Sequence, residues 1–543
     1  MAEPVPFLLK RCCLCGSPSL PYAFEVQGQR LCQCEGCSLL FFNPQPSDEA
    51  LEAIYTQGYF LGSEEPGGRE QVAAMKEATA RLYLAQLLDY HGSARGRLLE
   101  VGCGRGEFLG VAAEAGFEVS GVDVSPSSVA SANQRFGREA VLCGNLEDVP
   151  LQAGSYDVCA LFDAIEHVRD PSALLQRLHG LLKPGGTLFL STPSLDSWNA
   201  KLLKQHWMEF KTEHLFYFDG QTMQGLLAKG GFEQVEVTAT QKVLSLAYVN
   251  SHFERFKVPL FTPLLALLKA LSPRALHELP VKIPASGMNV LSRAAIKRPT
   301  PLLSVVVPVY NEAGTFPRLI EALQDKQLAG VDKEIILVES HSTDGTREQV
   351  LAFQGRPGFK VVLQEKARGK GNAVRAGLEV AQGDFVIIQD GDLEYDINDY
   401  DLLLEPLLCY RRGVVLGSRH SRSWKIRDYK GQPLVTLLLN GAHIFFATMI
   451  NWTCGADLRD PFTMYKVFRR DCLHGLRFKS NRFDFDFELI MKLLRKGYKP
   501  LELPINYRAR SFQEGKKVRM IRDPLTWLVA LVRFRLCKLY EKP

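Results

Sequence analysis

The sequence lacks long apolar runs and a strong excess of charge of either sign. Its start, MAEPVPFLLKRCC, has no apolar core of the length found in secretory leaders. The most apolar stretches do not suit a membrane span, because 258–271 is short and contains Pro and Lys, and 434–450 is interrupted by Asn440 and His443. The net charge of +5 gives no reason to expect nucleic acid binding. We therefore expect a cytoplasmic protein.

The chain is too long for one ordinary domain. Its 543 residues, of which 46% are hydrophobic and 23% charged, predict three or four well-packed domains. The strands and helices alternate along two long stretches, as described below. This alternation predicts an α/β protein of several domains.

Cysteine is present in an odd number, and its distribution is uneven. Six of the 13 cysteines lie between residues 12 and 37, and without an export signal they indicate a metal site rather than disulfides. Cys12 and Cys15 form one Cys-x-x-Cys pair, and Cys34 and Cys37 form a second pair 18 residues later. Four thiolates on two turns can close a structural Zn²⁺ site. We predict a zinc ribbon over residues 1–45; redox dithiols or incidental thiols are the alternative.

The next informative stretch is GRLLEVGCGRGEFLGVAAEAGFEVSGVDVS. A strand over 97–101 meets a glycine-rich turn and a helix, and a second strand ends at Asp123. The glycines allow a tight turn and close approach of the backbone to a ligand, and an acid about 20 residues later can bind ribose hydroxyls. A dinucleotide-dependent oxidoreductase could use the same pattern.

Three features make this region resemble the class I S-adenosylmethionine-dependent methyltransferases. Glu100 ends the first strand, 144–171 matches the third and fourth strand ends, and 181–194 matches the turn before the fifth strand. The resemblance implies a Rossmann-like domain with S-adenosyl-L-methionine as cofactor. It implies that Asp123 binds the ribose hydroxyls, that Gly102, Cys103 and Gly104 line the methionine part, and that Asn145 and Leu146 border the adenine. The other expected cofactor-binding residues are Glu100 and Gly106.

The methyl acceptor is expected near two later segments. Glu166 and His167 follow the fourth strand, and WMEFKTEHLFYF supplies His214. A neutral histidine near the sulfonium can take a proton from a hydroxyl or an acidic carbon, so His167 and His214 are candidate catalytic residues. A role in organising loops is the alternative. Zinc ribbons in front of such domains resemble sugar C-methyltransferases, which implies a sugar-linked acceptor. We place this domain at 46–297, with an apolar helical insertion at 240–286.

A second α/β pattern begins near residue 302 and delivers charged residues to successive strand ends. In an open α/β sheet, ligands bind at the carboxyl ends of the strands. The expected substrate-binding residues are Pro308, Tyr310 and Glu312 after the first strand, Glu339 and Asp344 after the second, Arg368 and Lys370 in a glycine loop, and Asp390 after strand 384–389.

The stretch QDGDLEYD places two carboxylates two positions apart. Asp390 and Asp392 point the same way from an extended chain and can hold Mg²⁺ or Mn²⁺. The cation would reconcile the acids with the diphosphate that Arg368 and Lys370 attract. A solvated acidic loop is the alternative for this pair taken alone.

These motifs resemble the family 2 glycosyltransferases of the GT-A fold, over roughly 302–523. The match includes VVVPVYNE, STDGT, GKGNAVRAG and DPFTMYKVFRRD. The resemblance is nearest to polyprenyl-phosphate sugar synthases, and implies inverting transfer from a nucleotide sugar to a lipid phosphate or glycan. It places Asp392 at the catalytic metal, Asp460 as a candidate base, and Arg510, Lys516 and Lys517 near the acceptor phosphate or donor diphosphate.

The C-terminal segment is basic and amphipathic. From residue 505 onward it carries ten Lys or Arg and three Asp or Glu. With the glycosyltransferase domain at 298–523, we assign 524–543 to a tail that either lies on the inner face of a membrane or docks on its own domain. The prediction is a bifunctional methyltransferase and glycosyltransferase; the alternative is that one domain is active and the other is a binding or scaffold module.

Overall fold

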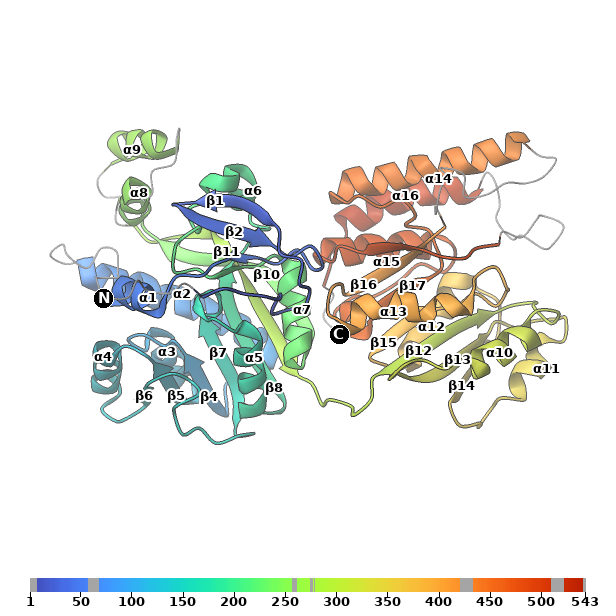
Figure 1. The fold of residues 1–543 in the computed structure, drawn as a ribbon, viewed down its shortest axis with the longest axis horizontal. Helices are drawn as coiled ribbons and strands as arrows, with labels where there is room; N and C mark the ends of the chain where they lie inside the picture. Colours follow the sequence, from blue (N-terminus) through green and yellow to red (C-terminus); the bar gives the residue numbers. More distant parts are fainter. Residues whose placement is uncertain are drawn as a thin grey trace. The chain divides into compact units, whose positions relative to one another are not determined.

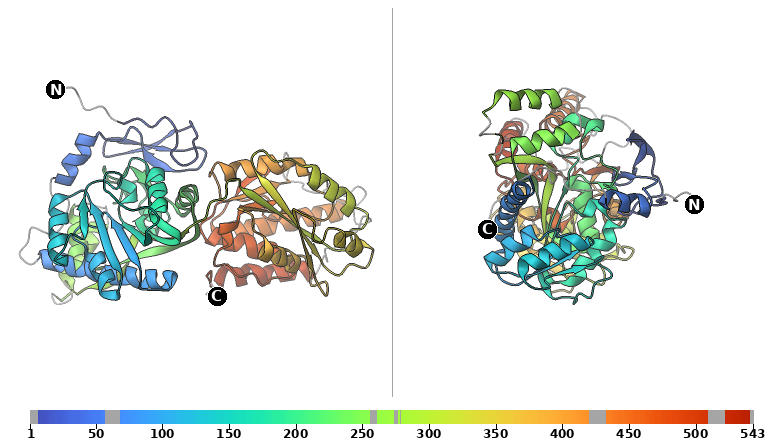
Figure 2. Two further views of the ribbon diagram at one scale, coloured as in Figure 1. Left: turned by 90° about the horizontal axis from the view of Figure 1, so that it is seen from below. Right: turned by 90° about the vertical axis from the view of Figure 1, so that its left-hand side faces the viewer.

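The computed structural model describes residues 7–56, 68–255, 261–273, 277, 279–419, 433–508 and 522–540. The chain divides into two compact units, Met1–Ile296 and Lys297–Pro543. Figures 1 and 2 show a β-sheet flanked by helices in each unit, and the expected multidomain α/β fold is confirmed. The predicted residues Arg510, Lys516 and Lys517 lie outside the described residues.

The first unit begins with a small antiparallel sheet whose order is β1-β2-β3-β9 among the described strands. Its strands are β1 (Tyr22–Val26), β2 (Gln29–Gln33), β3 (Leu40–Phe42) and β9 (Phe216–Tyr217). The last of these comes from far along the chain, and Leu40 pairs with Tyr217. The cysteine-rich segment therefore completes its sheet with a strand from the following domain.

The central sheet of the first unit has the order β10-β11-β8-β7-β4-β5-β6 in the described part of the chain. The five strands β8-β7-β4-β5-β6 are parallel, and β11 and β10 are antiparallel to their neighbours. The strands are β4 (Arg97–Val101), β5 (Glu118–Asp123), β6 (Val141–Cys143), β7 (Tyr156–Phe162), β8 (Leu182–Pro193), β10 (Phe232–Leu244) and β11 (Val281–Ala294).

The helices of this unit begin where the sequence supplies caps. Asp170 accepts hydrogen bonds from the first backbone amides of α5, which has Pro at its first position, and Asp219 and Thr222 form a capping box on α7. The helices are α1 (Asp48–Thr56), α2 (Gly68–His91), α3 (Glu107–Ala115), α4 (Pro126–Phe136), η1 (Ile165–His167), α5 (Pro171–Leu181), α6 (Trp198–Leu203), η2 (Lys204–His206), α7 (Gly220–Gly230), α8 (Leu246–Arg255) and α9 (Phe261–Leu271).

The expected helical insertion is shorter than its predicted range of 240–286. The range contains helices α8 and α9, but β10 continues to Leu244 and β11 begins at Val281. These strand ends pair with each other as a long antiparallel ribbon, from Gln241 opposite Pro284 to Leu244 opposite Val281. Because apolar residues recur along the whole of 240–286, the sequence did not show where β10 ends and where β11 begins.

The second unit contains a sheet with the order β14-β13-β12-β15-β17-β16-β18 in its described residues. Strand β12 pairs in parallel with both β13 and β15, so their carboxyl ends share one edge. The strands are β12 (Leu302–Val309), β13 (Asp332–Glu339), β14 (Phe359–Leu363), β15 (Phe385–Ile388), β16 (Val414–Ser418), β17 (Lys466–Arg469) and β18 (Leu501–Pro504).

Helices of the second unit include three that pack on one another near the end of the chain, α14, α15 and α16 (Figure 1). The helices are α10 (Phe316–Asp325), α11 (Thr346–Leu351), α12 (Lys370–Val380), η4 (Ile397–Asp399), α13 (Tyr400–Leu408), α14 (Pro433–Cys454), η5 (Arg470–Leu473), α15 (Asp484–Arg495) and α16 (Arg522–Leu536). Within the described residues, we find no helix with the length and apolar character that a membrane span requires.

Candidate functional sites

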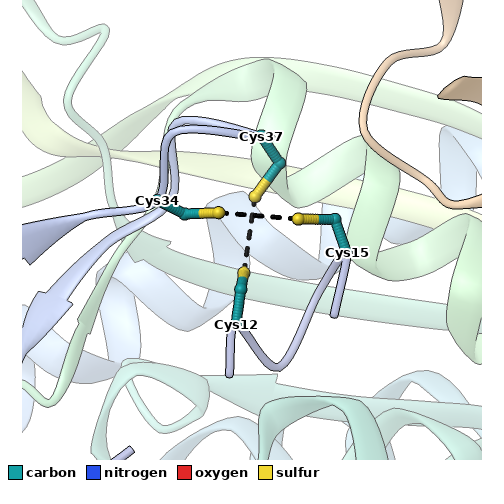
Figure 3. A group of neighbouring side chains, drawn as sticks. All are labelled: Cys12, Cys15, Cys34 and Cys37. Atoms are coloured by element: carbon teal, nitrogen blue, oxygen red, sulfur yellow. Dashed lines mark hydrogen bonds between the residues drawn. The ribbon is translucent and has the colours of Figure 1, made fainter. Parts of the chain in front are cut away.

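The four predicted cysteine ligands meet at one point. Figure 3 shows the sulfur atoms of Cys12, Cys15, Cys34 and Cys37 directed toward a common centre. Their Sγ atoms lie within 4.8 Å of one another, and the Cys12–Cys37 and Cys15–Cys34 pairs are 3.5 Å apart. A Cβ added to Gly36 would lie 3.1 Å from the sulfur of Cys15, so the turn closes tightly on the thiols. Four converging thiols are the donor set of a structural zinc site.

The cysteine-rich segment also packs against the segment that contains His214. The amide of Phe42 donates to the carbonyl of Leu215 at 3.1 Å, next to the pairing of β3 with β9. Buried side chains of both segments, among them Phe42, Trp207 and Tyr217, form one apolar cluster. The position of His214 therefore depends on the packing of the ribbon.

The predicted cofactor residues surround the carboxyl ends of β4 and β5. The carboxylate of Asp123 accepts hydrogen bonds from the amides of Gly104 and Ser125, at 2.8 and 2.9 Å. Gly102, Gly104 and Gly106 all have positive φ, which favours glycine and forms the tight turn over this edge. Cys103 is buried in the same turn, and Asn145 and Leu146 follow β6.

Glu100 is the acid at the centre of this edge. It is buried, and its Oε2 has no hydrogen-bond partner among the described residues. Burial, followed by the neighbouring Glu107 and Asp123, raises the pKa of Glu100 well above its usual value. A cationic or hydrogen-bond-donating ligand at this edge would satisfy the orphaned oxygen, and S-adenosylmethionine carries both a sulfonium and an amino group.

The two predicted catalytic histidines lie side by side, with ring centroids 4.7 Å apart. Each Nδ1 donates to a backbone carbonyl at 2.9 Å, that of Glu213 for His167 and that of Glu209 for His214. Burial lowers the pKa of His167 to about 4, and burial together with the adjacent ring lowers the pKa of His214 well below its usual value. Both rings are therefore neutral near pH 7.

Glu166 lies beside the two histidines. It is 1% exposed, its Oε2 accepts from Thr192 Oγ1 at 2.9 Å, and its Oε1 has no partner in the described structure. Burial, and then the charge of Asp163, raise the pKa of Glu166 to about 8. Lys242, which the sequence analysis did not single out, pairs with Asp163 at 2.7 Å. It comes from β10, so only the fold brings it to this site.

In the second unit, the predicted substrate-binding residues after β12 and β13 gather at one sheet edge. Glu339 is fully buried and accepts from Arg347 at 2.8 Å and from the amide of Ser342 at 2.6 Å. Asp344 accepts from the amide of Ala313, so the turn after β13 is tied to the loop after β12. Pro308, Tyr310 and Glu312 lie on that strand end and loop.

The loop after β15 carries the two metal-ligand candidates. Asp390 forms an ion pair with Lys370 at the start of α12, and Asp392 accepts from the amide of Glu394 at 3.2 Å. Burial alone would lower the pKa of Lys370, but the nearby carboxylates, Asp390 foremost and then Asp486 and Asp392, together outweigh burial and raise it. Arg368 lies exposed on the preceding loop. The structure thus places a lysine and two carboxylates at the strand edge, as the motifs suggested.

Two glycines allow this close assembly. A Cβ on Gly391 would lie 3.2 Å from the carbonyl oxygen of Pro308, and one on Gly369 would lie 2.5 Å from the carbonyl oxygen of Asn481. Gly369 also has a φ of +112°, a conformation that other residues rarely adopt. Both loops therefore approach the neighbouring backbone more closely than a side chain would permit.

Asp460, the candidate base, is held in a buried ion pair. Its oxygens accept from Arg419 Nη2 at 2.7 Å, Nε at 2.8 Å and the backbone amide at 2.9 Å. Burial alone would raise the pKa of Asp460, but the Arg419 guanidinium outweighs it and holds this pKa well below its usual range. A carboxylate with this environment is a weak proton acceptor. Arg419 was missed in the sequence because a lone arginine after a strand carries no distinctive signal.

Comparisons with known proteins match each of the two units to a different kind of domain. A methyltransferase domain model matches residues 72–237, and a glycosyl transferase family 2 model matches residues 304–476. A dolichol-phosphate mannosyltransferase of Pyrococcus furiosus is 26% identical over 218 residues, which cover 39% of this chain and 58% of that protein. The glycosyltransferase AglJ of Haloferax volcanii is 30% identical over 227 residues, which cover 41% of this chain and 69% of that protein.

Coverage of the curated relatives is partial. The chain spans less than two thirds of the mannosyltransferase and of a Haloferax volcanii hexosyltransferase, Agl6, which is 28% identical and 59% covered. Among solved structures, a methyltransferase of Thermotoga maritima, titled as a possible histamine N-methyltransferase, is 21% identical with a TM-score of 0.29; the match covers 41% of this chain and 91% of that one.

Proposed function

Because the chain belongs to glycosyl transferase family 2 and also carries a methyltransferase domain, we propose that it is a bifunctional enzyme of glycan or glycolipid synthesis. The first unit would transfer a methyl group from S-adenosylmethionine to a sugar-linked acceptor. The second would transfer a sugar from a nucleotide sugar to a lipid phosphate or glycan. The observation that carries the proposal is the assembly of Lys370, Asp390 and Asp392 at the carboxyl ends of the parallel strands β12, β13 and β15.

Glycosyl transfer would use this assembly as a clamp for the donor diphosphate. Mg²⁺ or Mn²⁺ would neutralise charge on the leaving nucleoside diphosphate. Asp390 and Asp392 fit as its ligands, since both are carboxylates on one loop beside a cationic side chain. Lys370 would hold the diphosphate, with Arg368 as a second cation on the exposed loop. Glu339 and Asp344 shape the neighbouring strand end, where the nucleotide would lie.

The acceptor is proposed to be a polyprenyl-type phosphate. Proteins named as dolichol-phosphate and dolichyl-phosphate sugar transferases are among the relatives. A phosphate monoester is already anionic near pH 7 and needs little help from a base, which suits the ionised, paired state of Asp460. In this proposal Asp460 positions Arg419 rather than accepting a proton, and the earlier assignment of Asp460 as base is reserved for a hydroxyl acceptor.

Contact with a membrane surface would bring the enzyme to such an acceptor. On α16, Ala530, Leu531 and Phe534 are buried against the domain, while Val529 and Val532 are 67% and 63% exposed. The helix therefore docks on its own domain, as one of the two sequence interpretations has it, and it still presents an apolar outer face. We propose that this face and the neighbouring α14 rest on the lipid interface.

Methyl transfer would take place between the glycine-rich turn and the histidine pair. S-adenosylmethionine supplies an electrophilic methyl group. Asp123 would bind the ribose, Glu100 would face the cationic part of the cofactor, and Asn145 and Leu146 would border the adenine. His167 and His214, both neutral, would face the acceptor. Zn²⁺ held by the four cysteines would fix the ribbon, on which the segment around His214 packs.

The test is a pair of assays on the full chain. Donor hydrolysis should be screened over nucleotide sugars with Mg²⁺ or Mn²⁺, and S-adenosylmethionine binding should be measured by titration calorimetry. Asp392→Asn should lower sugar transfer by about 100-fold or more while leaving S-adenosylmethionine binding unchanged. Asp396→Asn is the matched control, because it removes one charge from the same loop and keeps an N-capping side chain on η4. A unit that binds neither ligand would instead be a scaffold.

A further inference from the structure

The Glu166–His167–His214 cluster has the donor set of a second metal site, separate from the cysteines. A carboxylate oxygen of Glu166 and one nitrogen of each histidine lie within 4.8 Å of one another. Because each Nδ1 donates its proton to a carbonyl, the neutral rings carry their lone pairs on Nε2. The two rings thus offer acceptor nitrogens in the neighbourhood of a carboxylate.

Burial favours the protonated, uncharged form of Glu166, and a cation bound between Glu166 and the two rings would take the place of that proton. Oε1 of Glu166 is buried and has no hydrogen-bond partner within the described residues. Such an orphaned oxygen is costly, because it has lost its water without gaining a donor. Two lysines near the cluster are paired with other carboxylates, Lys242 with Asp163 and Lys211 with Glu209. A bound cation would satisfy this oxygen and take one ring nitrogen of each histidine as a further ligand.

The surroundings of the histidines match those of metal-ligating histidines in general. Such rings usually donate the other N–H to a carbonyl or carboxylate, which fixes both tautomer and orientation. His167 and His214 do so to the carbonyls of Glu213 and Glu209. With metal bonds of about 2.1 Å, ligand atoms lie about 3–4 Å apart, so a shift of under about 1 Å would close the site.

We propose that Glu166, His167 and His214 bind a divalent first-row metal ion of the zinc, cobalt or manganese class, and that this ion takes an oxygen of the methyl acceptor as a further ligand. Two imidazoles and one carboxylate leave coordination positions open, as sites that bind substrate do. The histidines then position the acceptor through the metal instead of removing its proton. The metal site stands on its own geometry, whereas the acceptor part rests on the proposed methyl transfer.

The test measures metal content of the full chain reconstituted with Co²⁺ and passed through a desalting column. The wild type should retain about two equivalents, and His214→Gln and Glu166→Gln about one. The intense near-ultraviolet bands of cobalt–thiolate ligation should persist in both variants, since they report the cysteine site. His206→Gln, which alters an exposed histidine, is the matched control and should retain about two.

Two results would overturn the proposal: a wild-type chain that holds about one equivalent with purely thiolate-type spectra, or a His214→Gln chain that still holds about two. The first needs no variant, so misfolding cannot obscure it. The expected counts leave out the loop of Asp390 and Asp392, because two carboxylates without a bound diphosphate should hold a divalent ion too weakly to survive desalting. Asp392→Asn checks this and should leave the count unchanged. S-adenosylmethionine titration is run in parallel. If S-adenosylmethionine does not bind but the cobalt count is as expected, the proposed methyl transfer is contradicted and the metal site is not.

Discussion

At the scale of single residues, partners decide what a charged group can do. Asp460 and Glu166 are both buried carboxylates, yet the pKa of Asp460 is held low by Arg419 while burial raises that of Glu166 to about 8. The difference follows from the presence of a guanidinium in one case and of the like charge of Asp163 in the other. The burial of both groups and the guanidinium opposite Asp460 are not visible in the local sequence, although Asp163 lies only three residues before Glu166.

Removing the charge of Asp460 should destabilise the second unit. Asp460→Asn leaves the Arg419 guanidinium, whose side chain is 4% exposed, without an ionised partner. Breaking a buried pair from one side typically costs about 3–5 kcal/mol of unfolding free energy. Urea unfolding should show a loss of this size, compared with under about 0.5 kcal/mol for the exposed Asp457→Asn control. A loss no larger than that of the control would mean that the pair contributes little.

The buried histidines should make the first unit sensitive to acid. His167 has a pKa of about 4 in the fold, lowered by burial from 6.5, and the pKa of His214 is lowered too. Between pH 6.5 and 4 the unfolded chain binds more protons at these two histidines than the folded chain, so their contribution to stability falls as the pH falls. The raised pKa of Glu166 acts in the opposite direction from about pH 8 to 4.5, and the two histidines together outweigh this single group. The urea midpoint of the transition that S-adenosylmethionine shifts should drop from pH 7 to pH 5.

His214→Gln should make that pH dependence shallower, because the variant lacks one group that must be kept uncharged. The exposed His206→Gln should leave the slope as it is in the wild type. Equal slopes in the wild type and His214→Gln would show that this ring is not kept neutral by burial.

At the scale of elements, helix α16 docks on its own domain, and in our proposal its outer face also contacts lipid. Its inner face supplies Phe534 to the core of the second unit, and its outer face exposes Val529 and Leu536, the latter by 79%. The helix begins at Arg522 and ends at Leu536, with Arg533 and Arg535 in its last turn. Basic residues beside an outward apolar face are typical of helices at an anionic lipid interface.

Replacing two outward valines should weaken vesicle binding. The double variant Val529→Ser and Val532→Ser keeps the buried face intact, so the fold should be retained. Co-sedimentation with phosphatidylglycerol vesicles should fall by about tenfold or more, since each buried valine is worth about 1.5 kcal/mol or more. Leu402→Ser, at a 45% exposed leucine on α13, is the control. Undiminished co-sedimentation of the double variant would remove α16 from the lipid contact.

At the scale of the whole molecule, the chain consists of two compact units, each with its own sheet and its own site. The cysteine-rich segment belongs to the first of them, because β3 pairs with β9 and Lys229 donates to the carbonyl of Leu14. The cysteine-rich segment is therefore coupled to the proposed methyl-transfer site through packing. The sequence analysis, which predicted a separate domain over residues 1–45, did not predict this packing between the two segments.

Removing zinc should consequently impair one unit only. Treatment with a strong chelator, or Cys15→Ser, should loosen the pairing of β3 with β9 and increase amide exchange over residues 207–217. Methyl transfer should fall in parallel, while donor hydrolysis by the second unit should stay within about twofold of the untreated value. Mutation of the exposed Cys143 to Ser is the control. Loss of both activities would indicate a global effect.

The sequence by itself determined the two α/β domains, the four converging cysteines and the strand-end motifs, because these features are written in local spacing. Strand β4 (Arg97–Val101) begins and ends as expected, and family membership followed from short contiguous stretches. Tertiary structure alone decided what lies opposite each group: Arg419 against Asp460, Lys242 against Asp163, and His214 beside Glu166 and His167. These partners come from distant strands and loops, and burial and charge at such meetings depend on packing that no local pattern contains.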